Sequence, residues 1–412
     1  MQGRSKNNFA CLCAMVLPIF LPQAGLCGHS YKVLYTFQGG SDGYFPLAPL
    51  IRDKSGNFYG ATEFGGGDGC ENLGCGTIFK LAPDGTKSIL HAFTGGSDGA
   101  LPVAGLVMDR AGHLFGTALG GGEGTCAGYL GCGTVFELDP GGTFTILYSF
   151  TGGSDGAQPG TLIAGPQGSL TGATAYGGNL GCYTGYGCGV IYQLKHSKQT
   201  VVHTFSGADG EFPGGFFASG GKLYGGAGSG GDNGYGVIYR LAGNGKETVL
   251  HSFDGTDGWG PGRPVVDEAG NFYGTTSEGG DGCEQWDEGC GTLFQLAPDG
   301  TLTVLHDFDG QGEGGVPSDL VRDAKGNLYG TTNDGGDMNC DPVDGCGEIF
   351  EFTVDGSFKQ LHVFAGTDGE APVARLLIGS DGHLYGTTSG GGNASCQYGG
   401  VGGCGVIFEI KE

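Results

Sequence analysis

The chain has 412 residues and a formal charge of −24, and 94 of its residues are Gly. Nucleic-acid binding depends on clustered Lys and Arg, so this excess of carboxylates argues against a nucleic-acid partner. The glycines recur in register, and a hydrophobic fraction of 38% supplies apolar area for a core. The composition therefore argues against disorder as well.

Residues 1–28 have the layout of a secretory signal peptide. Arg4 and Lys6 precede a short apolar run over residues 9–22. That run is a poor transmembrane span, and the sequence offers no second candidate. We therefore expect a secreted or periplasmic protein with no transmembrane span, in which residues 29–412 form a single domain.

The remainder of the chain is a tandem repeat with a period of about 55 residues, which is typical of solenoids and propellers. Its clearest marker is an acid-Gly-x-x-Pro loop that occurs seven times with the same internal spacing. The copies are Asp42/Pro46, Asp98/Pro102, Asp155/Pro159, Asp209/Pro213, Asp257/Pro261, Glu313/Pro317 and Asp368/Pro372.

Each repeat predicts four short antiparallel strands. In the second copy they span residues 102–108, 113–118, 133–138 and 144–150, and short Gly-containing turns separate the first from the second and the third from the fourth. Four strands in each of seven repeats predict an all-β fold, a seven-bladed β-propeller of four-stranded antiparallel blades.

The two ends of the repeat array predict how the ring closes. The array begins with an isolated strand of the fourth type, residues 33–37, and ends with one of the third type, residues 405–410. We therefore expect a propeller closed by the N-terminal strand, which completes the last blade.

Three recurring pieces carry a family resemblance: Gly-x-Leu-Tyr-Gly-Thr-Thr, Gly-x-Ile-Phe-x-Leu and Leu-His-x-Phe-x-Gly-x-x-Asp-Gly. They resemble the GloVer (Gloeobacter/Verrucomicrobia-type) tandem repeat of secreted or surface β-propeller-like proteins over nearly the whole of residues 29–412. The resemblance implies an extracellular location and transfers no catalytic residue.

The long loops between the second and third strands contain the cysteines of the predicted mature chain in pairs. An even number of cysteines in an exported chain favours disulfides, and pairing within each loop is the simplest connectivity. A four-thiolate metal site would need pairs from different blades to converge, so we predict neither a metal nor another cofactor. The fourth repeat lacks a pair. The pairs are Cys70/Cys75, Cys126/Cys132, Cys182/Cys188, Cys283/Cys290, Cys340/Cys346 and Cys396/Cys404.

The seven repeated acids suggest calcium binding or catalysis, but an Asp before Gly commonly fixes its own turn, which favours a structural role. The repeated histidines occupy one strand position and are interpreted as scaffold residues too. Their positions are His91, His203, His251, His306 and His362, with Tyr35 and Tyr148 in the other copies.

The fifth repeat departs most from the others, because it contains both tryptophans, Trp259 and Trp286. Exposed indoles flanked by polar groups suit a sugar platform, although each Trp could instead pack its own loop. The accompanying candidate ligand-binding residues are Arg263, Gln285, Asp287 and Glu288, and tyrosines including Tyr186 and Tyr235 extend the platform.

These features lead us to predict a monomeric, non-enzymatic protein that binds an extracellular glycan or protein ligand on the face with the long loops. A carbohydrate-active hydrolase or lyase is the rival hypothesis, with Glu123, Asp287 and Glu288 as candidate carboxylates. A structural envelope or matrix component is the third.

Overall fold

The computed structural model describes residues 29–126, 131–182, 185–283, 289–340, 344–398 and 401–411. The predicted signal peptide, residues 1–28, lies outside these ranges. None of the helices in the described part is long and apolar enough to cross a bilayer.

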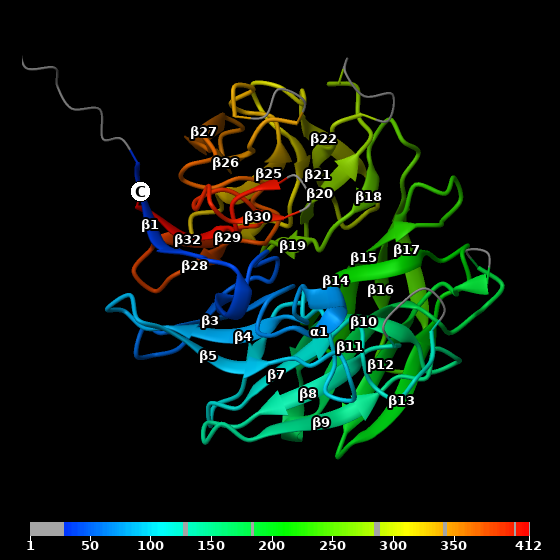
Figure 1. Cartoon of the computed structure of the whole chain (residues 1–412). Coiled ribbons are helices and arrows are strands. Elements are labelled where there is room, and N and C mark those ends of the chain that lie inside the picture. The colour runs from blue at the N-terminus through cyan, green and yellow to red at the C-terminus, as the bar shows by residue number, and fades with distance from the viewer. Residues whose placement is uncertain are drawn as a thin grey trace, which may run out of the picture.

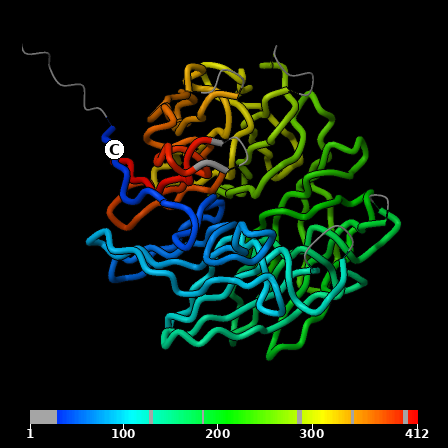
Figure 2. The backbone as a smooth tube through the Cα atoms, viewed as in Figure 1, coloured from blue at the N-terminus to red at the C-terminus, as the bar shows by residue number. Residues whose placement is uncertain are grey.

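Seven antiparallel sheets surround a central axis and form a seven-bladed β-propeller, as predicted (Figures 1 and 2). In each blade the first strand is innermost and the fourth is outermost. Blades 1 to 3 contain β2 (Ile51–Arg52), β3 (Phe58–Thr62), β4 (Thr77–Leu81) and β5 (Lys87–Ala92); β6 (Val107–Met108), β7 (Leu114–Ala118), β8 (Thr134–Leu138) and β9 (Phe144–Ser149); and β10 (Ala157–Ala164), β11 (Leu170–Tyr176), β12 (Val190–Lys195) and β13 (Lys198–Thr204).

The inner strand is divided into two short pieces in blades 5 and 6. Blades 4 to 6 contain β14 (Glu211–Ser219), β15 (Lys222–Ser229), β16 (Val237–Leu241) and β17 (Glu247–Ser252); β18 (Trp259–Pro261), β19 (Val265–Val266), β20 (Phe272–Glu278), β21 (Thr292–Leu296) and β22 (Leu302–Asp307); and β23 (Gly315–Pro317), β24 (Val321–Arg322), β25 (Leu328–Asp334), β26 (Glu348–Phe352) and β27 (Phe358–Val363).

Blade 7 joins the two ends of the chain. It contains β28 (Leu377–Ile378), β29 (Leu384–Thr388), β32 (Val406–Lys411) and, as its outer strand, β1 (Ser30–Thr36). In Figure 2 the blue start of the described chain lies beside the red end. The register pairs Tyr31 with Ile410, so the N-terminal strand completes the last blade, as predicted.

The remaining elements are short and lie in the loops. They are η1 (Gly40–Asp42), α1 (Gly69–Asn72), η2 (Pro166–Gly168) and a small ribbon of β30 (Gln397–Tyr398) and β31 (Val401–Gly402).

The inner strand of blade 2 is shorter than predicted. Residues 102–108 were expected to pair throughout, but only Val107 and Met108 do so. Leu101 has a left-handed φ of 58°, and Pro102 has no N–H to donate to a ladder. The loop that carries the acid-Gly-x-x-Pro motif therefore extends into the region expected to be strand.

The recurring glycine of each second strand lies under an aromatic ring of the third strand. In blade 2, a Cβ placed on Gly116 would lie 2.5 Å from Cζ of Phe136, a ring that is completely buried. No side chain fits between these strands, because interiors are packed without space for an extra methyl group. This contact explains why the second glycine of the Gly-x-Leu-Tyr-Gly motif in the second strand occurs together with the Phe of the Ile-Phe pair in the third strand.

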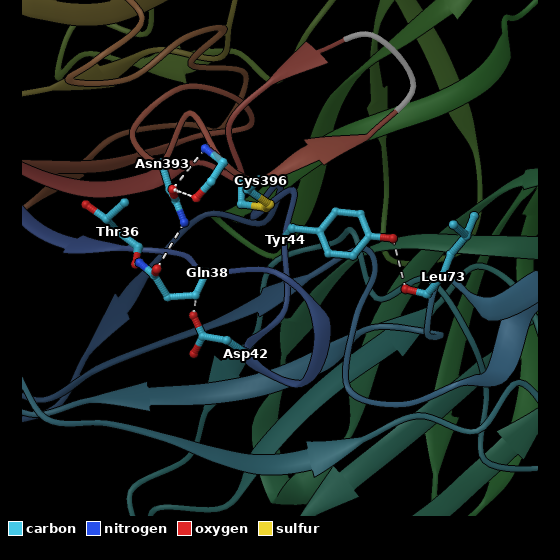
Figure 3. Close-up of a disulfide and its surroundings, with 9 residues drawn as sticks. Thr36, Gln38, Asp42, Tyr44, Leu73, Asn393 and Cys396 are labelled. Atoms are coloured by element: carbon cyan, nitrogen blue, oxygen red, sulfur yellow. Dashed lines mark hydrogen bonds between the residues drawn. A yellow bond between two sulfur atoms is a disulfide. The ribbon is translucent and has the colours of Figure 1, made fainter.

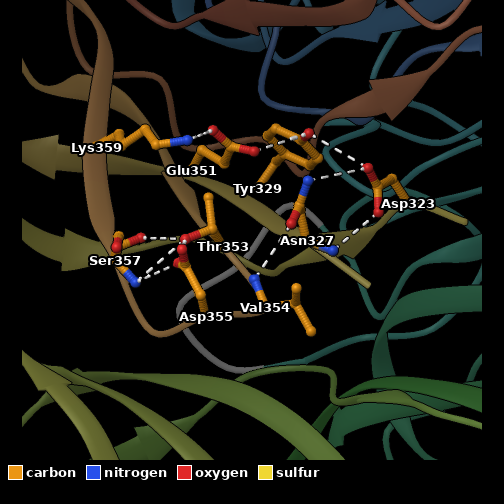
Figure 4. Close-up of polar contacts among 9 residues, drawn as sticks. All are labelled: Asp323, Asn327, Tyr329, Glu351, Thr353, Val354, Asp355, Ser357 and Lys359. Atoms are coloured by element: carbon orange, nitrogen blue, oxygen red, sulfur yellow. Dashed lines mark hydrogen bonds and ion pairs between the residues drawn. The ribbon is translucent and has the colours of Figure 1, made fainter. Parts of the chain in front are cut away.

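The two faces of the ring differ in loop length. The bridge between Ala100 and Gly120 places an inter-blade loop beside the long loop of the same blade. We call this side the long-loop face. On the opposite hairpin face, Asp323 accepts hydrogen bonds from the backbone N–H and the side-chain amide of Asn327, at 2.8 and 3.3 Å (Figure 4). Such Asp-centred turns keep the hairpins short.

Candidate functional site

Six disulfides lie within the long loops, with the pairing that the sequence predicted. Each also fits against the following inter-blade loop. In blade 2, a Cβ on Gly152 would collide with Sγ of Cys126, and the Cys132 carbonyl accepts a hydrogen bond of 2.9 Å from the Gln158 N–H. The disulfides therefore position the next blade as well as the loop in which they lie.

The second cysteine of every pair is buried beneath its loop. Both cysteines of each pair lie in the long loops, as predicted, and Cys290 and Cys404 have no exposed surface. Cys290 packs in a core cluster with Phe308, and Cys404 packs in one with Phe37. These sulfurs belong to the core beneath the long-loop face. The same burial is found for Cys75, Cys132, Cys188 and Cys346.

The inter-blade loops share a left-handed residue immediately before the proline. A non-glycine residue is strained in this conformation, and Val316, which is β-branched, is especially so. In every loop the N–H of this residue donates to the preceding long loop, usually to the carbonyl of the second cysteine. The seven residues are Phe45, Leu101, Gln158, Phe212, Gly260, Val316 and Ala371.

The junction between blades 7 and 1 uses side-chain hydrogen bonds in addition (Figure 3). The Asn393 amide beside Cys396 donates to Oε1 of Gln38 at 3.0 Å, and the Gln38 N–H donates to Asp42 at 2.8 Å. Tyr44 Oη donates to the Leu73 carbonyl at 2.9 Å. Hydrogen bonds thus connect the loops of the long-loop face at the junction where the two ends of the chain meet.

The repeated acids and the repeated histidines contact each other. Asp257 lies 2.6 Å from Nε2 of His251 and accepts a 2.9 Å hydrogen bond from the Asp254 N–H. In blade 3, burial opposes ionisation, but hydrogen bonds from His203 and Ser206 lower the pKa of Asp209. These contacts give the acids and histidines the structural role that the sequence analysis favoured.

A side chain at the start of the next blade's outer strand covers several of these pairs. The Phe144 ring stacks on His91 with centroids 3.6 Å apart, and the Phe358 ring stacks on His306 at 4.2 Å. In blade 1, Lys87 instead donates to Oδ1 of Asp42 at 2.8 Å. This contact between blades was not predicted, although the aromatic residues at this strand position are a signal for it.

Trp259 lies on the long-loop face, in β18, and packs on Tyr235 of blade 4. Their rings are nearly perpendicular, with centroids 5.6 Å apart. Tyr235 occupies the place of the missing fourth disulfide: its carbonyl accepts from the Gly260 N–H, and its ring lies against Gly255. The aromatic pair therefore connects blades 4 and 5, and 36% of Tyr235 is exposed.

Arg263 is held in a different environment from Trp259. Its Nε donates to the Phe216 carbonyl at 3.1 Å, its guanidinium lies 5.5 Å from the centroid of Phe217, and its backbone N–H donates to Asp319 at 2.7 Å. Burial, with the nearby Arg375, lowers the pKa of Arg263 to about 10. The structure thus directs Arg263 toward the inner strands and not toward the tryptophan.

The other predicted ligand-binding residues, Trp286, Gln285, Asp287 and Glu288, lie outside the described residues. Glu123, the third candidate carboxylate, is described and is exposed in the long loop of blade 2. The grouping of both tryptophans into one site therefore stays a prediction, as does the carboxylate pair of a hydrolase.

A second aromatic cluster lies at the junction of blades 3 and 4. The Tyr176 ring is 5.9 Å from that of Tyr186 and 5.3 Å from that of Phe212. Tyr186 is 42% exposed. Tyr186 was among the predicted platform residues, but its partners Tyr176 and Phe212 were not. The first repeat has Phe64 at the position of Tyr176, and Phe64 likewise lies in an aromatic cluster, with Tyr44 and Phe45.

Fold and loops define a disulfide-stapled, seven-bladed β-propeller with exposed aromatic residues on one face. The chain belongs to the Gloeobacter/Verrucomicrobia repeat family, whose model matches residues 21–186 and 184–397. No curated protein matches the sequence significantly.

Two solved structures share the fold at low sequence identity. The Niastella koreensis GH74 enzyme has 15% identity and a TM-score of 0.57, and the match covers 92% of this chain and 53% of that one. An extracellular domain described as that of a hybrid two-component system from B. thetaiotaomicron has 11% identity and a TM-score of 0.54, covering 91% of this chain and 40% of that one. The chain thus spans about half or less of these proteins, and the likeness shows the fold alone.

Proposed function

We propose that this protein is an extracellular, non-enzymatic binding protein that recognises a glycan on its long-loop face. The proposal rests on one observation: two aromatic clusters, Tyr176/Tyr186/Phe212 and Tyr235/Trp259, occupy neighbouring blade junctions on that face and keep Tyr186 and Tyr235 partly exposed.

Aromatic rings and sugar rings are chemically matched. The C–H face of a pyranose packs on an aromatic face, and nearby amides and carboxylates bond the hydroxyls. Asn233 lies close to Tyr235 in the sequence, and its amide donates to the Phe253 carbonyl, which leaves its side-chain oxygen as an acceptor at this edge. The disulfides and the strained inter-blade loops pre-organise the surface, which lowers the entropy cost of binding.

The full secreted chain should be screened against soluble polysaccharides for both retention and product release. We expect retention without release, and a Tyr186→Ala/Tyr235→Ala variant should bind at least tenfold more weakly. Val354→Ala is the control, because Val354 is 77% exposed and lies in a hairpin turn on the opposite face.

Several results would contradict the proposal. If the double variant is retained as strongly as the wild type, the two tyrosines do not form the binding site. Release of oligosaccharides would favour the hydrolase or lyase hypothesis. Absence of retention across the whole panel would favour a structural envelope or matrix protein.

A further inference from the structure

Near the axis of the propeller, one structural position recurs in all seven inner strands. In each blade, one residue of the inner strand lies opposite the recurring glycine of the second strand. The position in question is the residue directly before it in the chain, as follows from the registers of the strand pairs. We call these residues the axial ring. In blade order they are Pro49, Gly105, Thr161, Gly215, Arg263, Asp319 and Arg375.

The axial ring is charged on one side only. Blades 5 to 7 contribute Arg263, Asp319 and Arg375 in succession, and blades 1 to 4 contribute small or neutral residues. The packing is close where Arg263 meets blade 4, since a Cβ on Gly215 would collide with Cβ of Arg263. Only glycine fits there, so the arginine backbone is held near the axis.

The positive charge of the ring is not matched by carboxylates. Among the described residues, none of these three side chains forms an ion pair within 4.0 Å, and the side chain of Arg375 has no hydrogen bond. Asp319 is shared, since it accepts a hydrogen bond from the Arg263 backbone and interacts electrostatically with both guanidinium groups. Two cations facing one carboxylate near the axis are costly unless a further anion compensates them.

A cavity connects Arg375 to the hairpin face. It measures about 380 Å³ and is lined largely by aliphatic side chains, among them Leu50, Val265, Val321 and Leu376. Its residues belong to blades 1, 5, 6 and 7, at the ends of the inner strands that lead into the tight hairpins. Arg322 and Arg375 also line it, so the cavity combines aliphatic side chains with two guanidinium groups. Small-molecule sites commonly combine an apolar lining with a few convergent polar groups in this way.

We propose that the axial cavity binds a small organic anion, whose carboxylate or phosphate lies against Arg375 and Arg322, the two guanidinium groups that line it. A planar guanidinium pairs with two oxygens of such a group, and the aliphatic lining accommodates an organic body. The ligand enters from the hairpin face, so this site is separate from the proposed glycan surface and does not depend on it.

The test is a thermal-unfolding titration of the full secreted chain with inorganic phosphate, glucuronate and benzoate. Sodium chloride at equal ionic strength is the reference, because screening alone changes stability. We expect a saturable rise in Tm with at least one anion. Preference for glucuronate or benzoate would support a site for an organic anion, and saturation by phosphate alone would contradict it, because an inorganic ion makes no use of the aliphatic lining.

Two variants separate binding from folding. Arg375→Met should keep a Tm in chloride equal to or above that of the wild type, because an uncompensated cation is removed, yet bind the anion at least tenfold more weakly. Asp319→Asn should bind it at least threefold more tightly, since a competing carboxylate is lost. Arg110→Met is the control, as Arg110 is exposed in a hairpin of blade 2.

The proposal is overturned if no anion gives a saturable rise in Tm, or if Arg375→Met responds as the wild type does. It is also overturned if Asp319→Asn remains folded and binds the anion less tightly.

Discussion

Tyr31 stacks on His362 with ring centroids 3.8 Å apart and planes within 3° of parallel. Its hydroxyl also donates to the Asp368 carbonyl at 2.7 Å. Phe144 and Phe358 make the same stack on the histidine of their preceding blades. The N-terminal strand therefore closes the ring with the joint that other blades use, although 337 positions separate Tyr31 from Asp368.

Removing this ring should weaken closure. Tyr31→Ala is expected to lower the free energy of unfolding by about 3 kcal/mol, because a packed aromatic ring and a hydrogen bond are lost. Denaturant unfolding measures the change. Lys32→Ala is the matched control, since the Lys32 side chain is exposed on the same strand. Equal loss in both variants would show that the stack contributes nothing specific.

Glu348 makes stability depend on pH. Its side chain is completely buried, in the position that Thr77, Thr134 and Thr292 occupy in other blades. Burial raises its pKa from 4.5 to about 8, with Asp309 and Glu313 adding to the effect and Gln360 opposing it. The folded protein therefore binds this proton more tightly than the unfolded chain does. The contribution to stability is complete below pH 4.5 and is lost as pH rises through about 8.

Glu348→Gln should remove this dependence. We expect the variant to be more stable than the wild type by roughly 2–5 kcal/mol at pH 8.5, given about 1.4 kcal/mol per unit of pKa, and to show little difference at pH 4. Glu268→Gln, at an exposed position, should change neither value. A pH-independent difference between wild type and Glu348→Gln would contradict the assignment.

Two buried hydroxyls are expected to destabilise the core. Tyr192 and Tyr239 occupy the ring position that is Phe in the other blades, and each hydroxyl is buried without a partner among the described residues. Tyr239→Phe and Tyr192→Phe should each raise the free energy of unfolding by about 1 kcal/mol, as the desolvation cost disappears. Chemical denaturation measures this. A loss of stability would instead indicate that a bound water satisfies the hydroxyl.

The disulfides should stabilise the fold by a modest amount each. The Cys70–Cys75 bond closes a loop with a sequence separation of 5, so replacing both residues by Ala is expected to cost about 2 kcal/mol from loop entropy. Full reduction of the wild type should lower Tm further, because all the staples open. Unchanged Tm after complete reduction, verified by thiol titration, would contradict this expectation.

Local pattern was sufficient to predict the repeat, the strands and the staples. The acid-Gly-x-x-Pro loops and the cysteine pairs recur at short range, where spacing limits the possible structures. The inner strand was less predictable. Pro102 and the left-handed Leu101 interrupt its pairing, and a left-handed leucine has no signature in a single sequence.

The burial of the disulfides was not predictable from the spacing of the cysteines. Cys290 and Cys404 lie in the core because aromatic side chains of adjacent strands pack around them, and Cys283 and Cys396 are only partly buried. A pair of cysteines in a loop shows which sulfurs can join. The spacing does not show which of the two cysteines becomes buried once the blades have packed together.

The positions of the candidate ligand-binding residues could be seen only in the complete ring of blades. Arg263 and Trp259 are close in sequence, yet β18 carries the tryptophan against Tyr235 of blade 4, and the arginine contacts Phe216 and Asp319. These partners come from neighbouring repeats. No periodicity within one repeat indicates which side chains meet across a blade boundary.

Seven blades, their strand order, closure by the N-terminal strand and disulfide pairing within each long loop can be predicted from the amino-acid sequence alone, because hydrogen-bonded registers and short covalent loops follow from local spacing. The folded structure was needed to show that the acids pair with the histidines, that Tyr235 takes the place of a disulfide, and that Arg263, Asp319 and Arg375 lie close together near the axis. The histidine and the acid of a pair are only six or seven positions apart, but their contact depends on how the end of the outer strand and the following loop fold together. The other contacts join residues of different repeats, and their free energy depends on burial and charge in the closed ring.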